Sequence, residues 1–447
     1  MRTITLYDTY EGKKREFIPL TPGKVDIYYC GPTVYNYVHL GNFRPTITFD
    51  LLTRFLRACG YEVRCVSNYT DIDDKIIKEA KMEHKTEKEL SEFYIQAYED
   101  CLTKLNILPL YCHPKASEYI DKMASFIKDL EDKGDAYQGG EDIYFRVKSD
   151  PEYGSLSKQK IEDLDAGARI DVSSKKENPL DFALWKLTDD DGIKFDTVVG
   201  RGRPGWHTEC VVMVNSVFGK PLIDIHGGGF DLKFPHHENE IAQSEAHNGT
   251  RLANYWMHVG FLLTNGVKMS KSLGNSILAK DVLARHTGNA VRLFFLSTPY
   301  RSPVNYTEEA LTSFDKIDNK YKNALSKATR RLELANIEEK GILEEDKNTF
   351  LDALADDLNV SNALTVFEKE IKSINSLLMK KDSDLSLLAK TSNTAKELAD
   401  ILGLAYPIAP LSEEDKALYK DYLEAREKKD YAKSDELRPK LMEKGIL

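Results

Sequence analysis

The 447-residue sequence contains few cysteines and no closely spaced pair of them. Its six cysteines stand at positions 30, 59, 65, 101, 112 and 210. The absence of a C-x-x-C spacing argues against a disulfide framework and against a zinc ribbon. All of them except Cys30 and Cys210 stand among apolar neighbours, so we expect those four to be small core residues.

Long apolar runs are absent as well. No stretch approaches the length of a membrane span, and the start of the chain, MRTITLYDTYEGKK, lacks the apolar centre of a signal peptide. The composition, 41% hydrophobic and 30% charged, is typical of a soluble protein, and 447 residues exceed what one core accommodates. We therefore expect a cytoplasmic protein of three or four domains with no membrane segment.

The chain also lacks an excess of basic residues, since its formal net charge is −10. Such a charge is unfavourable for binding RNA, because phosphates are neutralised by Lys and Arg. One segment differs: six basic residues and a single acid, Asp318, fall between Lys316 and Arg331. It is either a local basic face for RNA or the solvated side of a helix. The six basic positions are 316, 320, 322, 327, 330 and 331.

The most informative stretch that is present runs from Cys30 to Asn42, CGPTVYNYVHLGN. It follows an apolar run, Val25 to Tyr29, that predicts a buried strand. A helix is predicted to begin near Pro45 and to stop at Gly60, and a second strand-like run follows at 61–67. This order predicts a βαβ unit, in whose turn backbone N–H groups at a helix N-terminus bind a nucleotide phosphate.

Three further motifs stand downstream: GWHTEC at 205–210, FPHHENE at 234–240 and KMSKS at 268–272. The HLGN at 39–42 and the KMSKS resemble the two signatures of class I aminoacyl-tRNA synthetases. With Cys30 and the two intervening motifs, the chain resembles the cysteinyl-tRNA synthetase family along nearly its whole length. The resemblance implies activation of L-cysteine with ATP and transfer of the cysteinyl group to the 3′ end of tRNA(Cys).

The resemblance also implies an α/β fold: a Rossmann-like parallel-sheet catalytic domain split by an insertion, then a C-terminal α-helical domain. Within the insertion we expect one helix, 116–133, followed by short strands. Apolar residues beyond 307 keep a helical period. The predicted regions are 1–115 and 199–257 for the two halves of the catalytic domain, 116–198 for the insertion, 258–306 for the KMSKS loop and stem-contact region, 307–405 for a helical bundle, and 406–447 for a small helical tail that begins the anticodon-binding region.

A metal site is suggested by two thiols and a helical pair. His236 and Glu240 are four residues apart just after Pro235, so one helix face carries both. With Cys30 and Cys210 they offer the donors of a tetrahedral Zn²⁺ site. The residues alone favour the other interpretation, two core cysteines beside a polar helix surface. In the family the zinc ligands fall on these four positions, which implies one Zn²⁺ per chain.

Candidate ATP-binding residues come from the two signatures. His39 and Asn42 can donate hydrogen bonds from a turn that contains Gly41, and Lys268 and Lys271 can reach phosphates from the KMSKS loop. The resemblance implies that Lys271 contacts ATP, which Mg²⁺ accompanies. Asn42 stands where the family signature has a second histidine, and it retains an N–H donor but cannot become cationic.

Candidate substrate-binding residues are Thr70, Trp206 and Asp231. Thr70 follows the second strand, at the edge where open α/β sheets bind ligands. The acids at 71, 73 and 74 either share that pocket or cap the next helix. The resemblance places Trp206 in the pocket wall and gives Asp231 either the substrate ammonium or the ATP ribose.

Two other functions remain open. A cysteine ligase that transfers to a small amino sugar, as in mycothiol biosynthesis, would share the metal and ATP motifs. A non-catalytic zinc- and RNA-binding module would not need His39 and Lys271. The helical region 307–447 favours tRNA as acceptor, so the expected partners are tRNA(Cys), ATP and L-cysteine, bound by a monomer.

Overall fold

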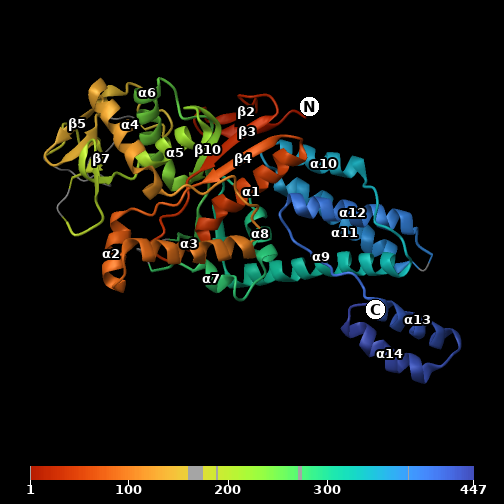
Figure 1. Cartoon of the computed structure of the whole chain (residues 1–447). Helices are drawn as coiled ribbons and strands as arrows, with labels where there is room; N and C mark the ends of the chain where they lie inside the picture. Colours follow the sequence, from red (N-terminus) through yellow and green to blue (C-terminus); the bar gives the residue numbers. More distant parts are fainter. Residues whose placement is uncertain (1, 160–174, 188–189, 270–273, 381, 447) are drawn as a thin grey trace. The chain divides into compact units, whose positions relative to one another are not determined.

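The computed structural model describes residues 2–159, 175–187, 190–269, 274–380 and 382–446 (Figure 1). These residues form two compact units. The first comprises Thr3–Arg285 together with Tyr300–Tyr306, and the second comprises His286–Pro299 together with the residues from Thr307 onward.

A four-stranded parallel sheet lies at the centre of the first unit, with the strand order β11-β10-β3-β4. Neighbouring strands pair in parallel throughout, and the β3–β4 register pairs Tyr29 with Ser67. The predicted parallel sheet is thereby confirmed. The strands are β3 (Lys24–Tyr29), β4 (Glu62–Ser67), β10 (Ile223–Gly229) and β11 (Ala253–Val259).

Helices cover both faces of this sheet, as two adjacent tyrosines of β3 show. The ring of Tyr29 stacks on Phe49 of α1 (Phe43–Ala58), with centroids 4.9 Å apart. The hydroxyl of Tyr28 lies 3.5 Å from the Met213 sulfur of α5 (Thr208–Phe218). Successive side chains of a strand point to opposite faces, so α1 and α5 lie on opposite sides of the sheet.

Helix α1 confirms the predicted βαβ unit. It begins one residue after the HLGN turn and ends at Ala58, before Gly60, whose φ of 91° suits glycine. Its buried side, which includes Phe49 and Leu52, packs on the sheet. The chain then returns as β4, parallel to β3.

The insertion confirms the predicted order of one helix and short strands. A turn at Ala116–Tyr119 leads into α4 (Ile120–Lys133), and an antiparallel sheet of order β5-β6-β7-β9-β8 follows. The buried side of α4 packs against residues of α5 and α6 in one core. The strands are β5 (Ala136–Gly139), β6 (Asp142–Phe145), β7 (Phe182–Lys186), β8 (Phe195–Thr197) and β9 (Gly200–Pro204).

Smaller elements complete the first unit. Asp73 caps α2, because its carboxylate accepts a hydrogen bond from Lys75 N at 2.8 Å. Capping is thus the role that the structure gives to this acid. The elements are β1 (Thr5–Asp8), β2 (Lys13–Glu16), α2 (Asp74–Glu83), α3 (Glu87–Lys104), α6 (Glu238–Asn248), β12 (Leu262–Thr264), β13 (Val267–Lys268), α7 (Ala279–Val282) and β14 (Val304–Tyr306).

The second unit is helical in its described residues, which confirms the predicted C-terminal helical region. Thr307 caps the long helix α9, and the Tyr321 ring packs edge-on against Phe367 of α11 at 5.0 Å. The helices are α8 (Gly288–Leu296), α9 (Glu308–Leu334), α10 (Glu344–Ala355), α11 (Val360–Met379), α12 (Leu385–Ile401), α13 (Glu413–Glu427) and α14 (Tyr431–Glu443).

One sequence expectation needs correction, and the structure adds detail to the basic segment. Cys65 and Cys101 are buried as expected, but Cys59 and Cys112 are partly exposed, because they lie at a helix end and in a loop. Four lysines of the basic segment in α9 are exposed, at positions 316, 320, 322 and 327. Its two arginines are engaged: Arg330 pairs with Glu333 at 2.8 Å, and Arg331 donates to backbone carbonyls at the end of α11.

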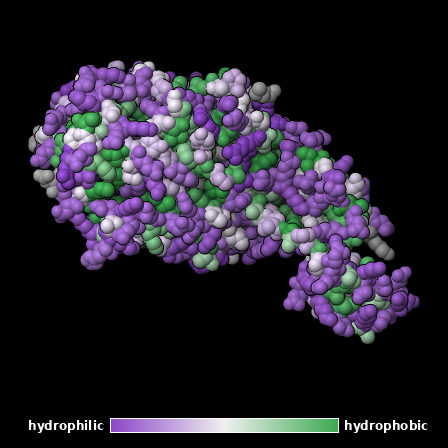
Figure 2. Space-filling view, viewed as in Figure 1, coloured by the Kyte–Doolittle hydropathy of each residue, from purple (hydrophilic) through white to green (hydrophobic). Residues whose placement is uncertain are grey.

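The surface drawn in Figure 2 is mostly hydrophilic, with apolar residues in small separate patches. Among the described residues, no helix is both long and apolar enough to span a membrane.

Candidate active site

A cavity of about 370 Å³ opens at the carboxyl ends of β3, β10 and β11. The chain leaves β3 toward β4 on one side and leaves β10 toward β11 on the other, so the cavity lies at a switch point of the sheet. Most sequence-predicted site residues line it: Cys30, His39, Gly41, Asn42, Trp206, Asp231 and Lys268. Lys271 lies outside the described residues.

The HLGN turn forms one wall of the cavity. Its last three residues, Leu40–Asn42, make a short helical turn that runs directly into α1. Asn42 Oδ1 accepts a hydrogen bond from His39 N at 3.1 Å, so the amide nitrogen of Asn42 is the group that can donate. A Cβ on Gly41 would lie 3.1 Å from the His39 ring, so glycine allows the close approach of this turn. Such a turn presents N–H groups to an anion.

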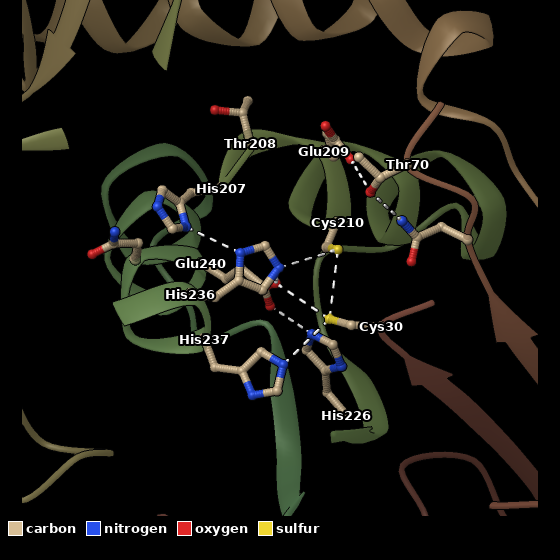
Figure 3. Close-up of polar contacts among 12 residues, drawn as sticks. Cys30, Thr70, His207, Thr208, Glu209, Cys210, His226, His236, His237 and Glu240 are labelled. Atoms are coloured by element: carbon tan, nitrogen blue, oxygen red, sulfur yellow. Dashed lines mark hydrogen bonds and ion pairs between the residues drawn. The ribbon is translucent and has the colours of Figure 1, made fainter. Parts of the chain in front are cut away.

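Two thiols, an imidazole and a carboxylate meet at the base of the cavity (Figure 3). We call Cys30, Cys210, His236 and Glu240 the thiol cluster. The sulfurs of Cys30 and Cys210 are 3.7 Å apart, and Cys210 Sγ is 3.7 Å from His236 Nε2. Glu240 Oε1 is 3.7 Å from Cys30 Sγ and 2.8 Å from His236 Nε2. The structure thus brings together all four residues predicted from the sequence.

Three separate parts of the chain supply the cluster. Cys30 follows β3, Cys210 lies in the first turn of α5, and Glu240 lies in the first turn of α6. His236 lies in the short π-helical segment Lys233–His237 that precedes α6, four residues before Glu240 and on the same side. Only Cys30 is partly exposed, and it is the member that lines the cavity.

The donor set fits a tetrahedral metal ion. Two sulfurs that each lie about 2.3 Å from a tetrahedral ion are about 3.8 Å apart, close to the 3.7 Å between Cys30 and Cys210. The four donor atoms all lie within 4.8 Å of one another. Two thiols with one imidazole and one carboxylate are ligands of a borderline-soft divalent cation.

The electrostatics of the cluster also suit a cation. The hydrogen bond from Cys30 lowers the pKa of Cys210 to about 6. Burial opposes protonation of His236, yet Glu240 and Cys210 raise its pKa to about 10. The pKa of Glu240 is held well below its usual value by the neighbouring histidines, against the effect of burial. Two anionic groups in one buried site balance the charge of a divalent ion.

Three buried histidines beside the cluster were not predicted from the sequence. His226 Nε2 lies 2.5 Å from Glu240 Oε2, and His237 Nε2 lies 3.3 Å from Cys30 Sγ. His237 Nδ1 is in turn 2.8 Å from His258 Nε2. Burial lowers the pKa of His258 to about 3 and that of His237 well below its ordinary value. For His226 and His258 the available signal was a histidine inside an apolar strand, as in IDIHGGG and ANYWMHV, and His237 was visible in the FPHHENE motif.

These histidines create a second candidate donor set. Cys30, His226, His237 and Glu240 also place one ligand atom each within 4.8 Å of the others. The two sets share Cys30 and Glu240. The second set contains a single thiol, whereas the first contains two.

Trp206, Asp231 and Lys268 flank the mouth of the cluster. The Trp206 ring stacks on His236 with centroids 4.2 Å apart and an interplanar angle of 23°. Lys268 Nζ lies 3.6 Å from Asp231 Oδ2 and 3.9 Å above the Phe261 ring. An aromatic wall, a carboxylate and an ammonium group therefore border the same cavity.

Thr70 is placed differently from these residues. It is buried and does not belong to the lining of the cavity. Its hydroxyl donates to Glu209 Oε2 at 2.7 Å, and Glu209 itself is buried, which raises its pKa well above the usual range. Sequence reasoning did not single out Glu209, although an acid directly before Cys210 was visible in the GWHTEC motif.

Comparisons with known proteins identify the family of the chain. The family model described as tRNA synthetases class I (C) catalytic domain matches residues 16–316, and the model described as DALR domain matches residues 349–406. The cysteine–tRNA ligase of Lactobacillus gasseri is 42% identical over 458 residues, which cover 99% of this chain and 97% of the relative. Cysteine–tRNA ligases of Staphylococcus aureus and Staphylococcus carnosus are 42% and 41% identical over 453 residues, with the same coverage.

Solved structures show the likeness of the fold. Methionyl-tRNA synthetase of Mycobacterium tuberculosis, in complex with methionyl-adenylate, superposes with a TM-score of 0.57 at 15% identity, covering 85% of this chain and 89% of that chain. A putative arginyl-tRNA synthetase from Campylobacter jejuni gives 0.54 at 14% identity, covering 88% and 95%. The match to the catalytic-domain model and the near full-length identity to the ligases show that the chain belongs to the cysteine–tRNA ligases, a family with a class I tRNA synthetase catalytic domain.

Proposed function

We propose that this protein ligates cysteine to tRNA: it activates L-cysteine with ATP to cysteinyl-adenylate and transfers the cysteinyl group to the 3′ end of tRNA(Cys). The observation that carries the proposal is the thiol cluster at the base of a cavity whose wall is the HLGN turn. Membership of the cysteine–tRNA ligase family supports it.

The first step joins two substrates in this cavity. A carboxylate oxygen of cysteine attacks the α-phosphorus of ATP, and the bond to pyrophosphate breaks. Negative charge develops on phosphate oxygens, and donors that are already in place stabilise it. In the proposal His39 and the Asn42 amide donate from the turn, and Lys268 and Lys271 supply positive charge from the KMSKS segment. Mg²⁺ accompanies ATP, as its preference for phosphate oxygens implies.

The thiol cluster is the proposed zinc site, with Cys30, Cys210, His236 and Glu240 as ligands. It is favoured over the set with His226 and His237 because two thiolates suit Zn²⁺ better than one. His226 then holds the second oxygen of Glu240 at 2.5 Å and fixes the orientation of that ligand. A bound zinc ion would supply a Lewis acid that prefers a thiolate to a neutral hydroxyl.

The remaining pocket residues hold the substrate in this proposal. Trp206 stacks on His236 and is 39% exposed, so its ring forms part of the wall of the cavity. Asp231 binds either the ammonium group of cysteine or the ribose of ATP. Thr70 remains a proposed substrate-binding residue from the sequence, but it does not line the cavity and its hydroxyl donates to Glu209, so its contact with substrate is the least supported of the three.

The helical unit is the proposed platform for tRNA. A ligase with a small amino-sugar acceptor has no need for the helices α9–α14, so the tRNA reaction is favoured over that alternative. The finer division of the chain given by the sequence, including 258–306 as a stem-contact region and 406–447 as the start of an anticodon-binding region, belongs to this proposal. So do a cytoplasmic location and a monomeric state.

An ATP–pyrophosphate exchange assay with cysteine tests the proposed activity, together with metal analysis of the purified protein. We expect cysteine-dependent exchange and one zinc per chain. Cys210→Ala should lose the zinc, whereas Cys65→Ala, which removes a buried thiol outside the cluster, should keep it. Lys271→Ala should lower the exchange rate far more than it weakens cysteine binding. Full zinc occupancy in Cys210→Ala would contradict the ligand assignment.

A further inference from the structure

We propose that Glu209 is a positioning residue of the thiol cluster: through the hydroxyl of Thr70 it ties helix α5, which carries Cys210, to the turn that carries Cys30. The inference rests on the proposed metal site. It concerns two side chains that donate no metal ligand, and we call their contact the Glu209–Thr70 link.

The turn that carries Cys30 is fixed to the end of β4. Gly31 N donates to Asn68 Oδ1 at 2.9 Å, Thr70 N donates to the carbonyl of Pro32 at 3.2 Å, and Val34 N donates to the carbonyl of Thr70 at 3.1 Å. The contact is close as well, because a Cβ on Gly31 would lie 1.7 Å from the carbonyl oxygen of Asn68. Residues 30–34 and 68–70 are therefore held together by three hydrogen bonds and a close backbone contact.

The side chain of Thr70 connects this piece to α5 (Figure 3). Its hydroxyl donates to Glu209 Oε2 at 2.7 Å and accepts from Asn68 Nδ2 at 3.3 Å. Thr70, Asn68 and Glu209 are each about 1% exposed. The Thr70 hydroxyl thus uses its donor capacity toward Glu209, which is 139 residues away in the sequence, and its acceptor capacity toward Asn68.

The carboxyl group of Glu209 makes few hydrogen bonds in the described part of the chain. Among the described residues, Thr70 supplies the hydrogen bond to this group, and the other oxygen, Oε1, is buried without one. A buried carboxyl group is costly, and hydrogen bonds offset that cost. Glu209 belongs to neither candidate donor set in the described chain, so a positioning role accounts for it better than ligation does.

The link can affect the thiol cluster because Glu209 stands next to Cys210 in α5. Glu209 directly precedes Cys210, and the side chains of consecutive helical residues point in different directions. Cys210 therefore faces Cys30 while Glu209 faces Thr70, as Figure 3 shows. Metal sites tolerate errors of only about 0.2 Å in ligand distances. The link holds the first turn of α5 at the spacing that brings the two sulfurs to 3.7 Å.

The test measures zinc release rather than activity alone. Purified wild-type protein and variants are mixed with an excess of a chromogenic chelator, without cysteine or ATP, and the rate of zinc transfer is recorded. Thr70→Val removes the hydroxyl at nearly constant shape, Thr70→Ser keeps it, and Glu209→Met removes the acceptor. We expect Thr70→Val and Glu209→Met each to release zinc about tenfold faster or more, and Thr70→Ser to stay near the wild-type rate.

A double variant decides whether the two residues act through one contact. If they do, Thr70→Val/Glu209→Met releases zinc no faster than the faster single variant. Effects that multiply in the double variant, or single variants that release zinc at the wild-type rate, would overturn the link. Melting temperatures identify any variant that fails to fold. In that case Thr70→Ala replaces Thr70→Val and Glu209→Leu replaces Glu209→Met, since each also removes the contact, and Glu209→Gln, which keeps an acceptor, is the matched control.

Three outcomes separate this inference from the proposed function. A raised KM for cysteine in Thr70→Val with unchanged zinc release would make Thr70 a substrate contact only, and would overturn the link while leaving the metal site intact. A wild-type protein that binds no zinc would remove the proposed metal site and the link together. Zinc-bound wild type with unaffected variants would remove the link alone.

Discussion

The substitution Gly31→Ala offers a direct test of how the cavity is built. A Cβ at this position would lie 1.7 Å from Asn68 O and 2.8 Å from the carbonyl carbon of the same residue. Ordinary contact begins at about 3.4 Å, so the two backbones must separate by about 1.7 Å. Backbone cannot rotate out of the way as a side chain can. The displacement is several times the roughly 0.2 Å that metal–ligand distances tolerate, and it falls on the residue next to Cys30.

We therefore expect Gly31→Ala to lose zinc during purification and to lose cysteine-dependent exchange. Its unfolding free energy should fall by about 1–3 kcal/mol, as for other overpacked sites. Gly12→Ala is the matched control. A Cβ there meets nothing within 4 Å, but the φ of +71° costs about 1–2 kcal/mol in any L-residue. The control should lose stability and keep its zinc. A Gly31→Ala protein with one zinc per chain and the wild-type release rate would refute the reasoning.

Three other predictions concern selectivity, RNA binding and stability. Serine should support exchange more than about a hundredfold less well than cysteine, beyond what steric exclusion gives, and seryl-tRNA(Cys) offered to the enzyme should hydrolyse no faster than in buffer. Lys320→Ala/Lys322→Ala should flatten the salt dependence of tRNA binding by up to about 2 in log–log slope, whereas Arg331→Ala should lower the melting temperature, because its guanidinium bonds the carbonyls of Leu378 and Lys380. Glu370→Gln should stabilise the protein at pH 8 but not at pH 4. Burial and Asp346 raise the pKa of Glu370 to about 7, so the folded chain binds this proton more tightly than the unfolded chain, and stability is lost as the pH rises toward 7.

Local patterns sufficed for the elements around the cavity. The apolar run before Cys30 predicted β3, and the helical spacing bounded by Gly60 predicted α1. Both elements are determined by residues that are close together in the sequence. The strand is an unbroken apolar run because both of its faces are buried, and the helix ends where Gly60 adopts a positive φ. The same reasoning missed the exposure of Cys59, since apolar neighbours do not reveal that a residue lies at the end of a helix.

The cluster itself was found through its motifs, but its surroundings were not. His226 lies beside Tyr28 and Trp256 because of the registers of β10 with β3 and β11. His258 belongs to the next strand, opposite Gly228. These contacts depend on strand order and register, which cannot be predicted from a local sequence pattern. The engagement of Arg331 by α11 was hidden for the same reason, since its partners lie about 50 residues away.

A site with four protein donors is usually a closed, structural one, and the geometry explains why this cluster differs. Cys210, His236 and Glu240 are almost fully buried, whereas Cys30 is partly exposed and borders the cavity. The open side of the cluster is therefore the side that faces the HLGN turn, which lies only nine residues beyond Cys30 in the sequence and lines the same cavity. In the proposed function, a substrate that presents its sulfur to the cluster would have its carboxylate on the side of the turn that we propose binds phosphates. Under this proposal, the short connection between Cys30 and His39 couples the choice of amino acid to the chemistry of activation.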